Sequence, residues 1–264
     1  MIEKVLQPIV ESYNVDEEYL YKDTYLFIKG YATGRKFKYT LKALPLARKV
    51  HNGEYRKGLV EYEGKKVQLP YLLHCLKVCS TLISLDFPMS DEELDILYTC
   101  ALLHDTLEDG EKYFPKEGNE FTQDYDFPPI VEEVIKLLSK HTGADEYELN
   151  TYFNRLKKNK FAILIKLADR SHNVEDLYNM KNIPKYIEET RKYFISKYGL
   201  CAYARDNYSE LSNGVTILKA KIVSLTEATE TILEKQQHLL DEKDAIIKKL
   251  SEEIEVLKKQ LASN

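Results

Sequence analysis

The stretch Leu102-Leu-His-Asp-Thr-Leu-Glu-Asp-Gly110 gathers four ionisable side chains at the end of an apolar run. On a helix, Glu108 would be the i+4 neighbour of His104, and Asp109 would be the i+4 neighbour of Asp105. One imidazole and three carboxylates would then form a single patch. Burying such groups is costly unless a metal ion or another charge meets them. The stretch therefore predicts half of a metal site, with an acid/base group beside it.

Two other apolar segments carry residues of matching chemistry. His74 lies in a predicted helix, and Asp169 ends a second strongly apolar one. Taken singly, His74 would be read as a core histidine, and Asp169 as the salt-bridge partner of Lys166 or Arg170. Taken together, three buried helices supply two histidines and two carboxylates, namely His74, His104, Asp105 and Asp169. This mixture suits a divalent metal such as manganese, iron or zinc and disfavours a thiolate site.

The hydrophobic spacing predicts an all-α chain with one small β-hairpin. Residues 58–69 read as two short strands around the turn Glu63-Gly64, and they carry the one clear β signal. Residues 110–127 read as a loop because they combine glycine, proline and many charges. Helices are predicted over residues 2–12, 16–29, 40–51, 70–85, 91–108, 128–141, 146–158, 160–178 and 184–204.

The chain after about residue 206 has a different pattern. Apolar residues recur every seven positions, with a second set offset by three: Leu240, Ile247, Ile254 and Leu261, then Leu250 and Leu257. Upstream of residue 240 the pattern continues with a shift of one residue. This is typical of a coiled-coil seam and predicts a homo-oligomer formed through the C-terminal helix. The alternative is one long helix packed on its own domain. We expect one domain over residues 1–205 and a helical tail over residues 206–264.

Composition excludes several functional classes. The 264 residues are 44% hydrophobic and 31% charged, as in ordinary globular proteins. The net charge of −5 gives no overall attraction to nucleic acid or to an anionic membrane. The four cysteines lack the spacing of a disulfide framework, and the first residues lack the features of a signal peptide. We therefore expect a cytoplasmic protein with neither a nucleic-acid nor a membrane partner.

Four motifs, in order along the chain, carry a family resemblance. They are Arg56-Lys57-Gly58, Pro70-Tyr71-Leu72-Leu73-His74, Leu103-His104-Asp105-Thr106-Leu107-Glu108-Asp109 and Lys166-Leu167-Ala168-Asp169-Arg170-Ser171-His172-Asn173. Their order resembles that of HD-domain phosphohydrolases, and their flanks resemble the hydrolase domain of RelA/SpoT homologues. That family includes stand-alone small alarmone hydrolases. The resemblance covers about residues 40–205 and implies a helical HD-domain bundle.

The resemblance implies manganese-dependent removal of the 3′-pyrophosphate from guanosine tetra- or pentaphosphate, yielding GDP or GTP and pyrophosphate; another divalent metal is the alternative. By matching position, the metal ligands would be His74, His104, Asp105 and Asp169. Glu108 and Asp109 match the pair that orients and deprotonates the attacking water. The substrate would contact Arg56, Lys57 and Asn173, with Lys140 added through a looser match.

The sequence also departs from the family pattern. The segment between Arg56 and Pro70 is longer than the family's usual link, so we expect the hairpin to shift the basic pair relative to His74. Glu175 and Asp176 follow Asn173, where the family often has neutral or basic residues. These acids leave the identity of the nucleotide open. The helical tail does not match a synthetase domain, so we do not expect synthesis.

Other functions fit the same residues. An HD phosphohydrolase acting on an adenosine alarmone, NADPH or a deoxynucleotide would use the same metal ligands. A second class is a non-catalytic module that senses nucleotides and assembles through its tail. A DNA- or RNA-binding protein is disfavoured because the chain is acidic and has no basic stripe.

Overall fold

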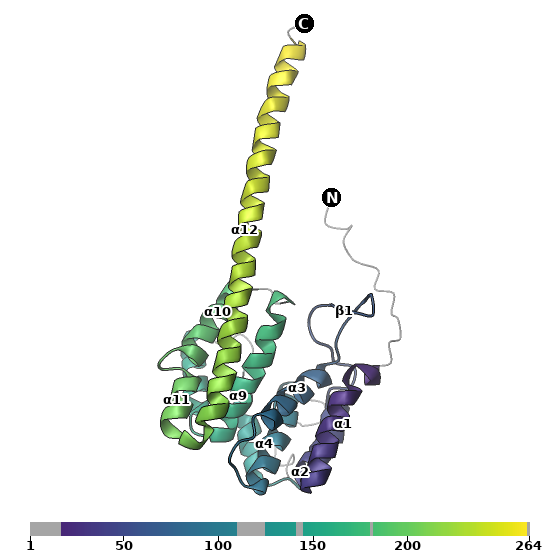
Figure 1. The fold of residues 1–264 in the computed structure, drawn as a ribbon, viewed down its shortest axis with the longest axis vertical. Helices are drawn as coiled ribbons and strands as arrows, with labels where there is room; N and C mark the ends of the chain where they lie inside the picture. The colour runs from purple at the N-terminus through teal and green to yellow at the C-terminus, as the bar shows by residue number, and fades with distance from the viewer. Residues whose placement is uncertain (1–16, 110–124, 141–144, 180–181, 263–264) are drawn as a thin grey trace.

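Helices form almost all of the chain, and one of them projects far from the rest (Figure 1). The structure is a computed structural model that describes residues 17–109, 125–140, 145–179 and 182–262. The helices are α1 (Glu17–Arg35), α2 (Lys38–Val50), α3 (Tyr71–Ser84), α4 (Asp91–Leu103), α5 (Thr106–Asp109), α7 (Pro129–Leu138), α8 (Glu146–Leu156), α9 (Lys160–Asn173), α10 (Ile183–Thr190), α11 (Leu200–Asn207) and α12 (Ser212–Ala262). Short 3₁₀ and π segments join them: η1 (Val174–Asn179), η2 (Arg191–Ile195) and η3 (Ser209–Leu211).

The predicted fold class is confirmed. Among the described residues, the strands β1 (Val60–Tyr62) and β2 (Lys65–Val67) pair to form one hairpin. The predicted helix over residues 2–12 lies outside the described residues. None of the described helices is long and apolar enough to cross a membrane.

The core is built around α3, α4 and α9. In α4 every residue from Leu94 to Leu103 is buried, which is the pattern of a helix covered on all sides. Ser90 starts α4 with a capping box: its hydroxyl accepts from the backbone N–H of Glu93, and its own backbone N–H donates to the Glu93 carboxylate. Asn159 caps α9 by accepting from two backbone N–H groups of its first turn. These caps set the first residues of α4 and α9, and both of these helices lead to site residues at their C-terminal ends.

The hairpin leaves the domain and returns to the same place. Glu63 and Gly64 both have positive φ, as a two-residue type I′ turn requires. At the base, the backbone N–H of Arg56 donates to Leu69 at 2.8 Å, and that of Tyr71 donates to Glu54 at 2.8 Å. The extra residues are therefore looped out, and Arg56 stays beside the first turn of α3.

Three predicted helices prove to be interrupted, which corrects the sequence prediction. The helix over 91–108 is interrupted at His104 and Asp105, where two side chains bond to carbonyls of the last α4 turn: His104 to that of Ala101 and Thr106 to that of Leu103. The helix over 160–178 ends at Asn173 and continues as η1. The helix over 184–204 becomes π-helical and then turns before α11. There Gly199 lies so close to the Phe194 backbone that a Cβ would be 2.8 Å from it.

The first part of α12 is integral to the domain. Val215, Leu218 and Ile222 are buried, and the Phe87 ring occupies the space that a side chain at position 214 would need. The C-terminal part of α12 extends beyond the other helices (Figure 1).

Glycine substitutions should separate these two environments. Gly214→Ala should lower the free energy of unfolding by about 1–3 kcal/mol, because its methyl group meets the buried Phe87 ring. Gly30→Ala should raise it by about 0.5–1 kcal/mol, because Gly30 lies inside α1 with no atom near the added methyl group. Urea unfolding followed by circular dichroism measures both. Equal effects of the two substitutions would contradict this packing.

Candidate metal centre and adjoining cleft

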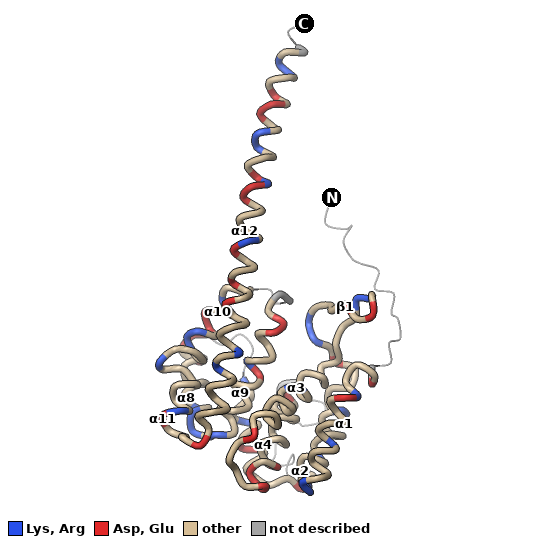
Figure 2. Tube along the Cα trace, in the orientation of Figure 1, with Lys and Arg blue, Asp and Glu red and all other residues tan. Residues whose placement is uncertain are grey.

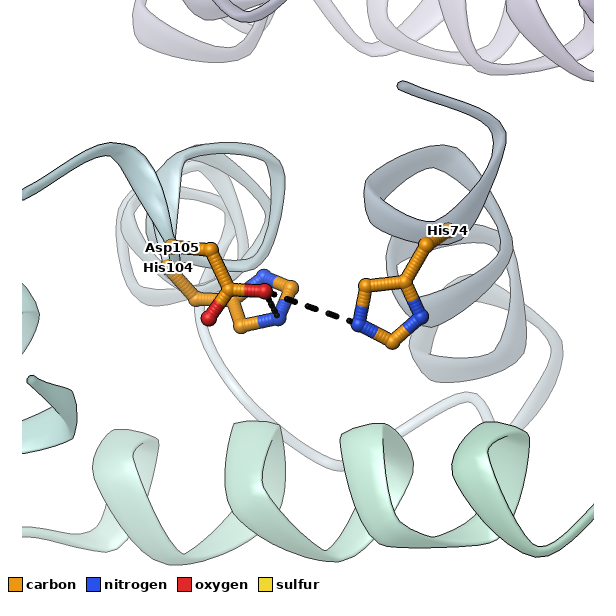
Figure 3. A group of neighbouring side chains, drawn as sticks. All are labelled: His74, His104 and Asp105. Carbon is orange, nitrogen blue, oxygen red and sulfur yellow. Dashed lines mark ion pairs between the residues drawn. The ribbon is translucent and has the colours of Figure 1, made fainter. Parts of the chain in front are cut away.

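Three side chains from two helix ends converge in the core (Figure 3). His74 is on α3, while His104 and Asp105 occupy the break between α4 and α5. Their candidate ligand atoms all lie within 4.8 Å of one another. Nε2 of His104 is 2.9 Å from Oδ2 of Asp105, and Nε2 of His74 is 3.6 Å from the same oxygen. Such a group of two imidazoles and a carboxylate has the composition and spacing of a metal site.

The fourth predicted ligand approaches from α9. Oδ1 of Asp169 lies 3.2 Å from Nε2 of His74, so Asp169 adjoins the group of three. Its oxygens also receive two bonds from its own helix. Nδ2 of Asn173 donates to Oδ1 at 2.5 Å, and Nζ of Lys166 is 2.9 Å from Oδ2. The structure thus brings together all four residues that the sequence predicted as ligands.

The tautomer of His104 suits metal binding. Its Nδ1 lies 2.8 Å from the Ala101 carbonyl, which fixes the proton on that nitrogen. In the neutral imidazole Nε2 then carries the lone pair, and within the described residues this nitrogen has no hydrogen-bond partner. It faces Oδ2 of Asp105 at 2.9 Å as an ion-pair contact. A buried nitrogen aimed at a carboxylate in this way fits a shared cation.

His74 is oriented by a second histidine. Its Nδ1 lies 2.8 Å from Nδ1 of His172. For Nε2 of His74 to offer a lone pair, the proton must sit on Nδ1 and be donated to His172. Burial lowers the pKa of His172 to about 2, helped by the neighbouring His74 ring, so His172 stays neutral and can accept. A third residue, Tyr71, donates its hydroxyl to Oδ2 of Asp105 at 2.7 Å.

Without a metal, the charges of the cluster balance internally. Burial alone would lower the pKa of His104, but the facing carboxylate of Asp105 raises it to about 9. Burial would likewise raise the pKa values of Asp105 and Asp169, yet His104 and Lys166 hold them below the usual range. Two carboxylates are thus matched at neutral pH by one imidazolium and one ammonium. A divalent cation would take the place of the imidazolium proton.

A cleft of about 770 Å³ opens beside the cluster. Tyr71 and Asn173 line it and also bond to Asp105 and Asp169, so the cleft and the cluster share a wall. Its basic and aromatic lining consists of Arg56, Lys57, Lys185, Tyr55, Tyr71 and Tyr186. Cations beside tyrosine rings suit a ligand that has both phosphates and a flat ring.

Arg56 ties the cleft to the cluster. It donates to Oδ1 of Asn173 at 3.0 Å and to Oδ2 of Asp176 at 3.1 Å. The expected shift of the basic pair does not separate Arg56 from these residues, because the hairpin is closed at its base. Asp176 lies where the chain leaves helical geometry, with φ −106° and ψ 18°. Its carboxylate thereby reaches the guanidinium group.

Helix α10 forms the opposite wall of the cleft, and Arg170 of α9 packs against it. The guanidinium carbon of this buried arginine lies 4.0 Å from the centre of the Tyr186 ring and 4.3 Å from that of Phe194. It also donates to Thr190 at 3.1 Å. Such stacking on two rings holds α10 against α9. Arg170 therefore acts as a structural residue beside its neighbour Asp169.

The remaining predicted site residues have different positions. Lys57 lines the same cleft as Arg56, whereas Lys140 lines a separate cleft of about 210 Å³ beside Tyr152 and Arg155. Glu108 and Asp109 belong to α5, and their side chains lie outside the described part of the structure. Their roles stay predictions.

Sequence reasoning gave no role to several residues that the structure places at the site. His172 and Tyr71 are polar residues within the quoted motifs. Their closeness in sequence to the proposed ligands was the available signal. Lys185 and Tyr186 carried no such signal, since they reach the cleft only because α10 folds back over η1 and α9. The four cysteines are all buried, as expected for helix residues.

Comparison with known proteins supports this description. Residues 71–174 match the family described as HD domain, a stretch that starts at α3 and ends just after α9. The chain is also 28% identical over 258 residues to the rice (Oryza sativa subsp. japonica) protein named "Putative GTP diphosphokinase RSH1, chloroplastic". That alignment covers 89% of this chain and 27% of the rice protein. The first match confirms the predicted HD domain over residues 71–174, and the second agrees with the resemblance to RelA/SpoT homologues. HD domains bind divalent metals, and the cluster lies within the matched residues.

Removing one imidazole should abolish tight metal binding. We expect His104→Ala to lower the affinity for Mn²⁺ by more than about 100-fold, since changes outside the ligand shell already cost about 10–100-fold. His238→Ala, which removes an exposed histidine of α12, should bind like wild type. Isothermal titration calorimetry measures both. Unchanged binding by His104→Ala would mean that the metal binds elsewhere.

The role of His172 as a hydrogen-bond acceptor gives a separate test. His172→Ala should lower Mn²⁺ affinity by about 10–100-fold, because the His74 ring loses its partner. His172→Asn should restore most of it, because the amide oxygen can take the place of Nδ1. The same titration distinguishes the two variants. If Asn were as damaging as Ala, His172 would contribute packing and not orientation.

Proposed function

We propose that this protein, whose HD domain is related to that of RelA/SpoT homologues, hydrolyses the 3′-pyrophosphate of guanosine tetra- or pentaphosphate. The products would be GDP or GTP and pyrophosphate. One observation carries the proposal: Asn173 bonds at once to Asp169 of the metal cluster and to Arg56 of the basic, tyrosine-lined cleft. A phosphorylated nucleotide in that cleft would present a phosphate to the cluster.

The cofactor in this proposal is Mn²⁺, held by His74, His104, Asp105 and Asp169. When bound, the metal would polarise a phosphoryl oxygen and acidify a water molecule towards a pKa of about 7. Nε2 of His104, which would give up its proton to a metal, and the two ionised carboxylates fit such a cation. Manganese suits this mixture of imidazole and carboxylate, although zinc and iron suit it too.

The protein's own groups would divide the remaining work. Glu108 and Asp109 follow the ligands Asp105 and His104 along the chain, and we assign them the orientation and deprotonation of the water. Arg56 and Lys57 would neutralise the charge that develops on the phosphoryl oxygens, where a guanidinium can bind two oxygens at once. The Lys140 cleft lies apart from these groups, and Lys140 is the weakest of the proposed contacts.

Asp176 leaves the identity of the nucleotide open within the same reaction class. Its carboxylate already pairs with Arg56 in the cleft, so an incoming phosphate must compete for that guanidinium. A nucleotide whose base or sugar donates hydrogen bonds to Asp176 would regain the lost pairing. Guanine and adenine can both donate in this way, so an adenosine alarmone, NADPH or a deoxynucleotide is kept as the second candidate substrate class.

The substrate can be identified directly. Purified protein with Mn²⁺ should convert ppGpp to GDP and pyrophosphate, as read by ion-exchange chromatography, and should leave the adenosine analogue, NADPH and dGTP largely unchanged. His104→Ala and Glu108→Ala should each lose more than about 99% of the activity, because they remove a metal ligand and the proposed base. Chelation of the metal should have the same effect.

The controls test the substrate and the metal site separately. Arg48→Ala, which removes an exposed arginine that pairs with Glu18 on α1, should keep full activity. Turnover of another nucleotide in place of ppGpp would refute the alarmone assignment and leave the metal site intact. No turnover of any of the four, with Mn²⁺ bound, would favour the nucleotide sensor.

A further inference from the structure

The C-terminal part of α12 exposes a continuous apolar face. Leu233 is the last apolar residue of α12 that packs against a cluster of the domain. Beyond it, Leu240, Ile247, Leu250, Ile254 and Leu257 are each between 51% and 60% exposed. A stripe of this length is unusual for a helix surrounded by water, because isolated apolar patches of such extent mark contact sites.

The heptad positions of these residues indicate which partner binds the exposed face. Leu240, Ile247 and Ile254 are seven apart and form the a positions of a heptad, while Leu250 and Leu257 form the d positions. Isoleucine at a combined with leucine at d favours two parallel strands over three or four. The stripe is therefore complementary to itself, and we propose that α12 pairs with α12 of a second copy as a parallel two-stranded coiled coil.

The flanking charges support the parallel direction. In this frame Glu253 is a g residue and Lys258 is the e residue of the next heptad. In a parallel dimer Glu253 of each chain faces Lys258 of the partner subunit, which gives two attractive pairs. Acidic and basic residues alternate along the projecting part of α12 (Figure 2). The apolar residues between them are left for the partner.

The seam shifts by one residue near the domain. The doublets Leu239-Leu240 and Ile246-Ile247 widen the stripe there, with all four residues at least half exposed. Lys243 lies between the doublets and is the one charged residue on the stripe. A lysine inside a coiled-coil seam lowers stability but fixes register, because its ammonium group must reach water. We therefore expect residues 247–257, away from the domain, to be the most stable part of the coiled coil.

A parallel dimer has a consequence for the whole molecule. Both HD domains would lie at the N-terminal end of the coiled coil, since the first part of each α12 belongs to its own domain. The two clefts would then be held near each other with no contact between them required. This arrangement is independent of the nucleotide that the cleft binds.

Light scattering after gel filtration tests the assembly. At about 10 µM the full chain should have twice the 30.8 kDa of one copy. Ile254→Glu should weaken the dimer by more than about 100-fold, because it places a charge in the seam. The matched control is Val256→Glu, an equally exposed residue at a c position outside the seam, which should stay dimeric. A monomeric wild type, a trimer or tetramer, or equal effects of the two variants would overturn the proposal.

A cysteine placed on the seam tests direction. Leu257→Cys should form a disulfide-linked dimer on mild oxidation, because only parallel, in-register helices bring the two Cα atoms within about 7 Å. The native cysteines are all buried and should not interfere. A dimer that does not crosslink would be antiparallel, contrary to the proposal. Both measurements read mass and not turnover, so they stand apart from the test of the reaction.

Discussion

The structure depends on how two buried carboxylates are neutralised. Asp105 and Asp169 reach into a core made of apolar helices, where an uncompensated charge would cost many kcal/mol. Lys166 answers Asp169 from within α9, and the raised pKa of His104 provides the second positive charge. Each acid therefore has one cation of its own. That balance lets the helices fold around the site before any metal is present.

The helix break at His104 is part of the same arrangement. His104 and Thr106 bond to the carbonyls of Ala101 and Leu103 in the last turn of α4. The bond to Ala101 holds the imidazole ring with Nε2 facing Asp105. The interruption between α4 and α5 therefore coincides with the position of two proposed ligands.

The sequence predicted the helical class, the hairpin and the ligand set because these depend on local patterns. Apolar runs ending in His104 or Asp169 place a polar group at a helix end, and the Glu63-Gly64 pair specifies a tight turn. The helix breaks were missed because the apolar periodicity continues through them. The cleft wall from α10 was missed as well. It depends on Arg170 stacking between Tyr186 and Phe194, a contact between segments that no spacing rule connects.

Asn173 connects the candidate metal cluster to the cleft. It stands at the last turn of α9, four residues after Asp169, and its amide donates to that carboxylate while its carbonyl oxygen accepts from Arg56. The chain then enters η1, whose Val174 and Leu177 pack in one cluster with Leu225 and Leu233 of α12. An ion pair between Glu175 and Lys221 joins the same two elements. The residues that orient Arg56 are therefore held by the root of the projecting helix, so the wall of the cleft depends on α12 being folded.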